Sequence, residues 1–392
     1  MKHLPHQQRQ RHGFTLIELL VAVTIGMGLT LAITLMLIRS EAERRALTSI
    51  NDTSNNGAYL AYTLDRTLRS AGSGFVQGWK NAYGCALQAQ RTGLGTFLPR
   101  ASAYPPPFGS VPLTLRLAPL VVQAGAGWGG SDVLIVQIGS SGLGEAPLQV
   151  LTNSADSSSL RIPTTMGLRG GDLVAIVQDP AANGNPSMCL LQQVATGYVG
   201  DTDIRLNMGG VYYNASVGGV LLADVGTTAR AWVTPLGNEA DNRPAFQLLG
   251  VAENNTLVSY DLLRLDSSNA VVPLADGVVD MRARYGVDIN DDGVIDSWEA
   301  PIGSTWGAAA LLDGTAAASL SLSRIVSVRL ALVMRNSTPE KAAVTPAALP
   351  LFSDLPTALQ AQHTVTGTDT TLRYRVLDFT VPLRNAMLTQ RP

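Results

Sequence analysis

One long apolar run near the start of the chain predicts a membrane-spanning helix. Between Phe14 and Ile38 the only ionisable side chain is Glu18. At a rise of about 1.5 Å per residue, a helix over residues 14–38 would be about 37 Å long, enough to cross a hydrocarbon core of about 30 Å. The leader before it, residues 1–13, carries Lys2, Arg9 and Arg11 but no acidic residue. The positive-inside rule therefore predicts that the leader stays on the cytoplasmic face.

The helix is expected to continue past the membrane as a stalk over residues 39–72. Apolar residues recur at helical spacing as far as residue 68, and Asp65 precedes Arg69 by four positions, a pairing that supports a helix. The glycines at positions 72 and 74 provide a stop signal. The polar residues 51–57 are the weak point, because their side chains compete for backbone hydrogen bonds and favour a bend or an interruption.

After residue 72 the pattern changes to short apolar runs bounded by Gly, Asn, Asp or Pro, which are typical of strands. We predict strands over residues 131–138, 172–178, 219–222, 275–286, 324–334 and 371–382. The connections between them are turn-rich and include the Ala- and Gly-rich residues 307–318. The predicted fold class is α+β, with a long N-terminal membrane-spanning helix packed on a β-rich globular region over residues 73–392.

Composition supports an exported, loop-rich protein. Of the 392 residues 46% are hydrophobic and only 15% are charged, with 38 glycines and 21 prolines. The formal net charge is −2 and becomes more negative once the basic leader is removed, so no nucleic-acid partner is expected. With one spanning segment, everything after residue 38 is predicted to be periplasmic or extracellular.

The two cysteines, Cys85 and Cys189, would then lie in an oxidising compartment. A disulfide between them is the favoured interpretation, and a pair of buried free thiols is the alternative.

The junction between leader and helix carries a specific motif. The small residue Gly13 lies before the apolar run, whereas an ordinary secretory signal is cleaved after its apolar core. The sequence from Gly13 through Phe14 to Glu18, GFTLIE, resembles the prepilin signal of type IV pilins and type II secretion pseudopilins. This resemblance implies cleavage after Gly13 by a prepilin peptidase and N-methylation of Phe14.

Glu18 is costly in a membrane, at about 2.5–3.5 kcal/mol for a carboxylate at mid-bilayer, and such residues are usually paired and functional. The new amine of Phe14 would lie four residues away on the same straight helix, where the two groups cannot easily meet. We therefore expect Glu18 to pair with the amine of a neighbouring subunit during filament assembly, the role that the pilin resemblance also implies. The alternative is a lone, tolerated charge.

Later segments resemble the PilW family of minor pilins. The matching runs are SDVLIV at residues 131–136, PLADGVVDM at 273–281, YGVD at 285–288, IVSVRL at 325–330 and VPLRN at 381–385. This resemblance implies a structural subunit that is held in the inner membrane with its N-terminus cytoplasmic and later enters the pilus. The implied partners are other minor pilins, the major pilin, the prepilin peptidase, the inner-membrane assembly platform and an adhesin at the tip.

A second motif predicts a calcium site. Residues 288–299 satisfy D-x-[DN]-x-[DN]-G-x₅-E over twelve positions and resemble an EF-hand loop. The expected ligands alternate along the loop because a tight turn directs every second oxygen inward: Asp288, Asn290, Asp292, the carbonyl of Val294, Asp296 and Glu299. The flanks differ from an EF-hand because the preceding residues form a predicted strand. An Asp- and Gly-rich hairpin turn without metal is the alternative.

Catalysis has little support in the sequence. Three of the four histidines lie in the leader, and His363 lies in a polar Gln-rich segment that we predict to be a loop. No nucleophile elbow, phosphate-binding loop or cysteine metal motif is present. The chain is therefore expected to be a non-enzymatic minor pilin that acts in pilus assembly or initiation at the filament tip. The alternatives are a J-type pseudopilin of type II secretion and a calcium-dependent tip adhesin.

Overall fold

The structure is a computed structural model. It describes residues 15–141, 146–181, 183–201, 203–263 and 271–386, with only the backbone at residues 42, 43, 45, 46, 49, 50 and 52. The chain divides into two compact units, one ending at Asp52 and one running from Thr53 to the C-terminus. Each unit is described by itself.

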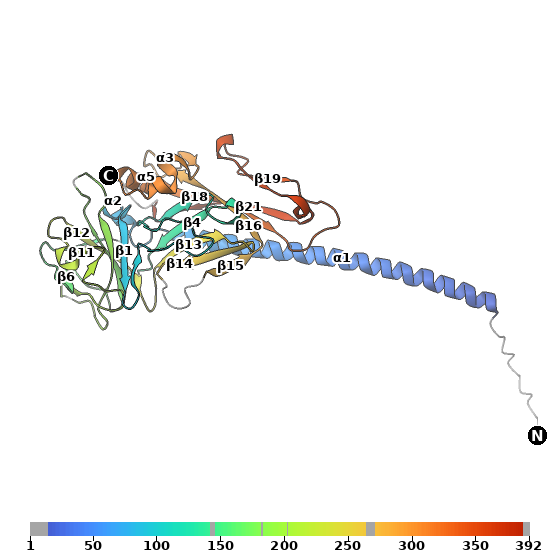
Figure 1. Ribbon diagram of the computed structural model, residues 1–392, viewed down its shortest axis with the longest axis horizontal. Helices are drawn as coiled ribbons and strands as arrows, with labels where there is room; N and C mark the ends of the chain where they lie inside the picture. Colours follow the sequence, from blue (N-terminus) through green and yellow to red (C-terminus); the bar gives the residue numbers. More distant parts are fainter. Residues whose placement is uncertain (1–14, 142–145, 182, 202, 264–270, 387–392) are drawn as a thin grey trace, which may run out of the picture. The chain divides into compact units, whose positions relative to one another are not determined.

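One helix, α1 (Leu16–Arg69), runs through both units without a break (Figure 1). Its segment Leu16–Glu41 has a mean hydropathy of 2.3 and is long and apolar enough to cross a membrane. The threonine hydroxyls at positions 24, 30 and 34 donate to carbonyls three or four residues earlier, so these polar groups are satisfied within the helix. The predicted weak point at residues 51–57 does not interrupt the helix.

In the second unit, the end of α1 packs on the β-rich region. Leu60, Leu64 and Leu68 recur every four residues and are almost fully buried. Gly57 allows close approach, because a Cβ atom there would lie 2.8 Å from Leu377 Cδ1 and 3.0 Å from Met334 Sδ. This packing explains why the polar stretch stays helical, since tertiary contacts outweigh local preference. After Arg69 the chain turns, and Gly72 has a φ of +80°.

Three larger sheets and three two-stranded pairs make up the β-rich region. The six-stranded sheet has the order β2 (Gly95–Leu98), β1 (Ala86–Arg91), β8 (Met188–Gln193), β7 (Asp172–Gln178), β12 (Ala231–Asn238) and β5 (Leu148–Gln149). The five-stranded sheet has the order β15 (Val272–Asp276), β14 (Thr256–Asp261), β13 (Ala245–Val251), β4 (Val133–Ile138) and β3 (Leu120–Gln123). The four-stranded sheet has the order β17 (Ser297–Glu299), β16 (Val278–Val287), β18 (Ile325–Arg335) and β21 (Tyr374–Pro382).

The remaining elements are short. The two-stranded pairs are β6 (Ser159–Arg161) with β9 (Arg205–Asn207), β10 (Ser216–Val217) with β11 (Val220–Leu221), and β19 (Ala348–Leu351) with β20 (Ala361–Thr364). The α-helices are α2 (Trp79–Ala82), α3 (Gly303–Trp306), α4 (Ala308–Leu311) and α5 (Ala316–Arg324). The 3₁₀ turns are η1 (Val76–Gly78), η2 (Trp128–Gly130), η3 (Leu222–Asp224), η4 (Thr357–Leu359) and η5 (Gly367–Thr371).

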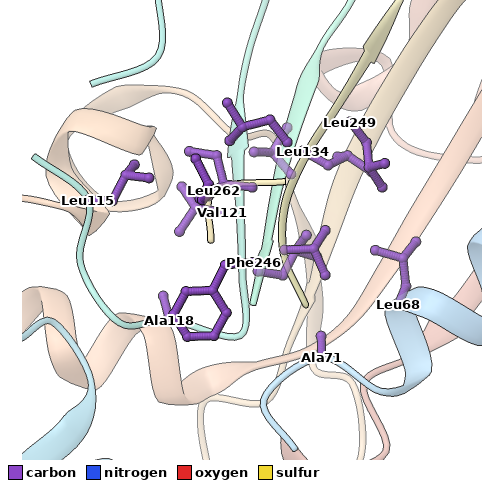
Figure 2. Close-up of a cluster of buried hydrophobic side chains, with 14 of the residues drawn as sticks. Leu68, Ala71, Leu115, Ala118, Val121, Leu134, Phe246, Leu249 and Leu262 are labelled. Atoms are coloured by element: carbon purple, nitrogen blue, oxygen red, sulfur yellow. The ribbon is translucent and has the colours of Figure 1, made fainter. Parts of the chain in front are cut away.

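The largest hydrophobic core joins all three larger sheets to the end of α1. Figure 2 shows Leu68 and Ala71 facing Phe246 and Leu249 of β13 and Leu134 of β4. A second core lies on the other face of the six-stranded sheet, because alternate residues of β7 such as Val174 and Ile176 belong to it. A small third core lies beneath the β19–β20 hairpin.

The predicted fold class is confirmed: an N-terminal apolar helix precedes a β-rich globular region. All six predicted strand segments contain strands, although residues 275–286 span the end of β15 and most of β16. The Ala-rich residues 307–318, predicted to be a connection, instead form α4 and the start of α5. Alanine has the highest helix propensity, and Thr315 caps α5 by accepting from Ala318 N at 3.1 Å.

Candidate functional site

The predicted processing residues, Gly13 and Phe14, lie outside the described residues. Glu18 lies in the first turn of α1, where its Oε2 accepts from the amide of Thr15 at 3.4 Å and from Thr15 Oγ1 at 3.3 Å. The amide of Glu18 in turn donates to Thr15 Oγ1 at 3.4 Å. This arrangement is a capping box, which the sequence analysis missed although the pattern T-x-x-E was present. Among the described residues, Glu18 Oε1 has no hydrogen-bond partner, so the cap leaves one carboxylate oxygen available.

The segment that carries Glu18 exposes its apolar side chains on all sides. In the first unit none of Leu16–Glu41 is buried, and Leu16 and Met36 are 79% and 76% exposed. A helix that is hydrophobic all round is stable only in an apolar environment, either lipid or other helices. Its chemistry is therefore that of a membrane anchor and of a surface for other apolar helices.

The acidic loop, residues 288–299, follows β16, includes the short strand β17 at its end and is built around Asp288. Asp288 is only 5% exposed, and its Oδ1 accepts from the amides of Asp291 at 2.7 Å and Asp292 at 3.2 Å. Its Oδ2 accepts from the amide of Gly293 at 2.8 Å. Asp291 and Gly293 have φ values of +64° and +85°, so the tight turn uses the left-handed backbone that Asp and Gly tolerate best.

Further along the loop, polar side chains converge on Asn290. Its Nδ2 donates to Asp292 Oδ2 at 3.2 Å and to Asp296 Oδ1 at 3.3 Å. Asp296 Oδ2 accepts from the amide of Ile289 at 2.7 Å and so closes the loop. An amide donor thus lies between two carboxylates, the kind of position that a cation also favours.

The predicted ligands are only partly brought together. Asp288, Asn290, Asp292 and Asp296 belong to one hydrogen-bonded loop, whereas Glu299 lies on β17, opposite Tyr285, and accepts from Ser297 Oγ at 3.0 Å. Within the described residues, no group of three or more His, Cys, Asp or Glu side chains is placed to hold a metal ion. The oxygen donors suit calcium in kind, but the position of Glu299 does not complete a coordination shell.

The cysteines lie on neighbouring parts of the six-stranded sheet. Cys189 is on β8, Cys85 immediately precedes β1, and these two strands are the parallel pair of the sheet. The structure joins the two sulfurs in a disulfide with Cα atoms 5.5 Å apart, within the usual range. Both residues are fully buried in the largest core.

His363, predicted to lie in a loop, is instead on strand β20 of the hairpin beside the four-stranded sheet. Its Nδ1 lies 3.0 Å from Asp280 Oδ2, and Asp280 Oδ1 lies 2.9 Å from Arg282 Nε in an ion pair whose atoms are not aligned for a hydrogen bond. Nearby, burial raises the pKa of the Asp132 carboxyl, although the amides of Gly125 and Ala283 oppose that rise. The contacts of His363 and Asp280 hold the hairpin on the sheet.

A cavity of 460 Å³ lies on the six-stranded sheet; no predicted site residue lines it, although Ala86, Met188 and Leu190 are sequence neighbours of the two cysteines. Its lining includes apolar side chains from β7, β8 and β11 and the guanidinium of Arg116. Arg116 donates to the carbonyls of Gly84 at 2.7 Å and Leu312 at 2.8 Å. Arg116 therefore joins the segment before β1 to the end of α4 through hydrogen bonds.

Two family models match the chain. The prokaryotic N-terminal methylation motif covers residues 8–37, and PilW, described as type IV pilus-assembly protein W, covers residues 249–385. The chain thus matches a PilW-family type IV pilin at its N-terminus and in its C-terminal part. None of the curated proteins and none of the solved structures matches it.

The two matches leave the middle of the chain, residues 38–248, unmatched. The PilW match begins within β13 and contains the acidic loop, the four-stranded sheet and the β19–β20 hairpin. The disulfide, the second core and the cavity fall between the two matches. The resemblance stated from the sequence is therefore confirmed for the pilin helix and for the C-terminal part of this PilW-family protein.

Proposed function

We propose that this protein is a minor pilin that acts in the assembly or initiation of a type IV pilus, at the filament tip. The observation that carries the proposal is the exposed apolar segment Leu16–Glu41, which has a single carboxylate in its first turn and continues into a helix anchored by the β-rich region. Such a segment anchors the subunit in the membrane before assembly and can contact other apolar helices in a filament. The bulky C-terminal region favours a tip position, because repeating it along a close-packed fibre would strain lateral packing.

Deletion of the gene tests the class of function. Loss of pili and of twitching motility would support the proposal. A defect in secretion of folded proteins with normal pili would overturn it in favour of a J-type pseudopilin. A defect in adhesion with a normal number of pili would overturn it in favour of a tip adhesin.

Processing provides a second test. We expect the native protein to begin at methylated Phe14, and Gly13→Val to leave the uncut precursor in the membrane because the larger side chain blocks the peptidase. Intact-mass measurement of pilus and membrane fractions decides between these forms. Retention of residues 1–13 in assembled material would contradict the prepilin assignment.

Glu18 is proposed to pair with the N-terminal amine of a neighbouring subunit. We expect Glu18→Ala and Glu18→Gln to insert in the membrane at least as well as wild type, because each removes a charge, but to enter sheared pili about tenfold less, a loss of roughly 1.4 kcal/mol. Thr15→Val is the matched control, because it removes the hydroxyl of the capping box and keeps the carboxylate. Normal incorporation of Glu18→Ala, or an equal defect in Thr15→Val, would rule out the intersubunit pair.

We further propose that the acidic loop takes a calcium ion and that the cysteines are bridged in the native protein. The loop supports calcium through its oxygen-rich donors and the absence of Lys and Arg between residues 288 and 299. A cation would compete with the Asn290 amide for the oxygens of Asp292 and Asp296. The 5.5 Å separation of the cysteine Cα atoms supports the bridge.

A further inference from the structure

Strand β21 forms one edge of the four-stranded sheet, and the backbone groups on its outer side are unpaired among the described residues. It pairs over nine residues with β18 and with no other strand in the described part of the chain. The other edge strands of the three larger sheets have two to five residues: β2, β5, β15, β3 and β17. At about 3.4 Å per residue, β21 offers an edge of roughly 30 Å.

The hydrogen bonds at its two ends show which amides point outward. The amide of Asn336 donates to the carbonyl of Arg373, and the amide of Leu383 donates to the carbonyl of Val326. Because β21 has no bulge, the odd-numbered residues between them face β18 and the even-numbered ones face away. Among the described residues, no group accepts from the outward amides of residues 374, 376, 378 and 380.

Strand β21 has no bulge along its pairing with β18, so this long edge is only partly protected. Natural edge strands are kept from pairing by bulges, charged side chains or a covering segment. The two charged residues of β21 are exposed but already have partners: Arg375 donates to Ser54 Oγ on α1, and Asp378 accepts from Arg329 Nε at 2.7 Å and Nη2 at 2.9 Å. Figure 1 shows β21 beside β18 at the margin of this sheet.

The side chains along β21 are also incompletely covered. All of its residues except Val381 keep some exposure, whereas β18 is buried at all but two positions. Val376, Leu377 and Phe379 are only partly buried, so an added strand would remove apolar surface from water as well as pair the four amides. Only an extended backbone matches donors and acceptors that alternate at this spacing.

We propose that β21 accepts an extended strand from a different pilus subunit, which extends the four-stranded sheet by antiparallel or parallel pairing. The inference rests on the proposed function, because that function supplies the neighbouring subunits. A second copy of this chain is disfavoured: the antiparallel register that pairs all nine residues of β21 with itself would place Asp378 opposite Asp378, and like charges in that position repel. The incoming strand should therefore be apolar at alternate positions and carry no acidic residue opposite Asp378.

Thr380→Pro tests the edge without disturbing the rest of the sheet. Proline removes the outward amide of an exposed residue, and its ring projects away from β18, so no internal hydrogen bond is lost. Thr380→Val is the matched control, because it keeps the amide and changes only the side chain. Both full-length variants should accumulate in membranes and melt like wild type.

The readout is photo-crosslinking in the native host, with a benzophenone side chain in place of Phe379. We expect an adduct with another pilus subunit that falls about tenfold in Thr380→Pro and is unchanged in Thr380→Val, because one main-chain hydrogen bond is lost and its acceptor is left unpaired. An undiminished adduct in Thr380→Pro, or an adduct with the mass of two copies of this chain, would overturn the proposal.

Failure of the edge proposal and failure of the proposed function give different results. If deletion of the gene leaves piliation unchanged, the proposed function fails. The crosslink in membranes would still show whether β21 accepts a strand from another protein. If deletion abolishes pili while Thr380→Pro assembles and crosslinks normally, the edge proposal alone is wrong.

Discussion

Replacing Asp288 by alanine should destabilise the acidic loop more than any other single change within it. Asp288 is nearly buried and its carboxylate accepts three amide hydrogen bonds, from residues 291, 292 and 293. Alanine removes all three acceptor contacts while leaving the bond from the Asp288 amide to the carbonyl of Arg324 in place. The loop would then lose the centre around which its turn is built.

The size of the effect follows from these contacts. A hydrogen bond to a charged group contributes about 1.5–3 kcal/mol, but residues 291–293 are exposed and water can replace part of the loss. Allowing about 1 kcal/mol for each bond gives a destabilisation of roughly 2–3 kcal/mol for Asp288→Ala. This corresponds to a fall in melting temperature of about 3–4 °C for a unit of this size. Asp288→Asn should lose about half as much, because one oxygen remains to accept.

The proposed calcium ion would add an independent contribution to stability. If the loop binds calcium with a Kd of about 10⁻⁴–10⁻³ M, then 10 mM calcium should stabilise the folded protein by about 1.4–2.7 kcal/mol. Glu299→Gln separates this contribution from the hydrogen bonds, because Glu299 accepts from Ser297 Oγ and takes no part in the Asp288 turn. It should leave the melting temperature in chelator within about 1 °C of wild type, since a solvated contact contributes little. It should reduce the calcium shift if Glu299 moves to become a ligand when calcium binds, as the twelve-residue motif predicts.

The assay is thermal unfolding of the full-length protein in detergent, with calcium and with chelator, together with hydrogen exchange of the amides at residues 291–293. Asp288→Ala should lower the melting temperature in chelator and speed exchange at those amides. Unchanged exchange in Asp288→Ala would refute the argument from hydrogen bonds. A wild-type protein with no calcium-dependent shift at millimolar calcium would refute the metal site and leave a hairpin turn.

Two further predictions concern the rest of the second unit. Replacing Cys85 and Cys189 by serine should destabilise the protein by about 4–5 kcal/mol in the chain-entropy model for so long a loop, as measured by denaturant unfolding. Thiol labelling of protein purified from the native host and then unfolded should find no free cysteine. Gly57→Val should destabilise the protein by about 2–3 kcal/mol, because its side chain overpacks the contact with Leu377 and Met334. Gly57→Ala should be close to neutral in the same measurement, since a gain in helix propensity of about 1 kcal/mol offsets a contact with two flexible side chains.

The elements that the sequence predicted best were those whose pattern is decided locally. The apolar run and the glycine signal at Gly72 anticipated a helix that the structure ends at Arg69, and the Val- and Leu-rich runs identified strands such as β7 and β18. Strand β12 was missed because it contains Pro235, a residue that normally argues against a strand between two others. A register shift between Pro235 and Gly237 accommodates the missing amide, and pairing with β7 holds the rest of the strand.

The turn of the acidic loop could be predicted from the sequence, but the arrangement of its side chains could not. The spacing of Asp288, Asn290 and Asp292 correctly indicated a tight turn, because short polar side chains bond to amides a few residues ahead. The position of Glu299 depends on the pairing of β17 with β16, which a twelve-residue motif does not contain. The contact of His363 with Asp280 joins residues 83 positions apart and was likewise invisible in the sequence.

The division of the core indicates which parts of the second unit hold the end of α1 and which do not. The contacts that hold the end of α1 come in part from β18 and β21, through Met334 and Leu377, and both strands lie within the PilW match. The second core instead packs on the far face of the six-stranded sheet, outside both matches, and contains none of the residues that touch Gly57. Since distant sites without shared partners act nearly independently, substitutions in the second core should alter the stability of that region without altering how the C-terminal sheet holds the helix. Changes that impair pilus assembly should therefore concentrate on α1 and on the four-stranded sheet.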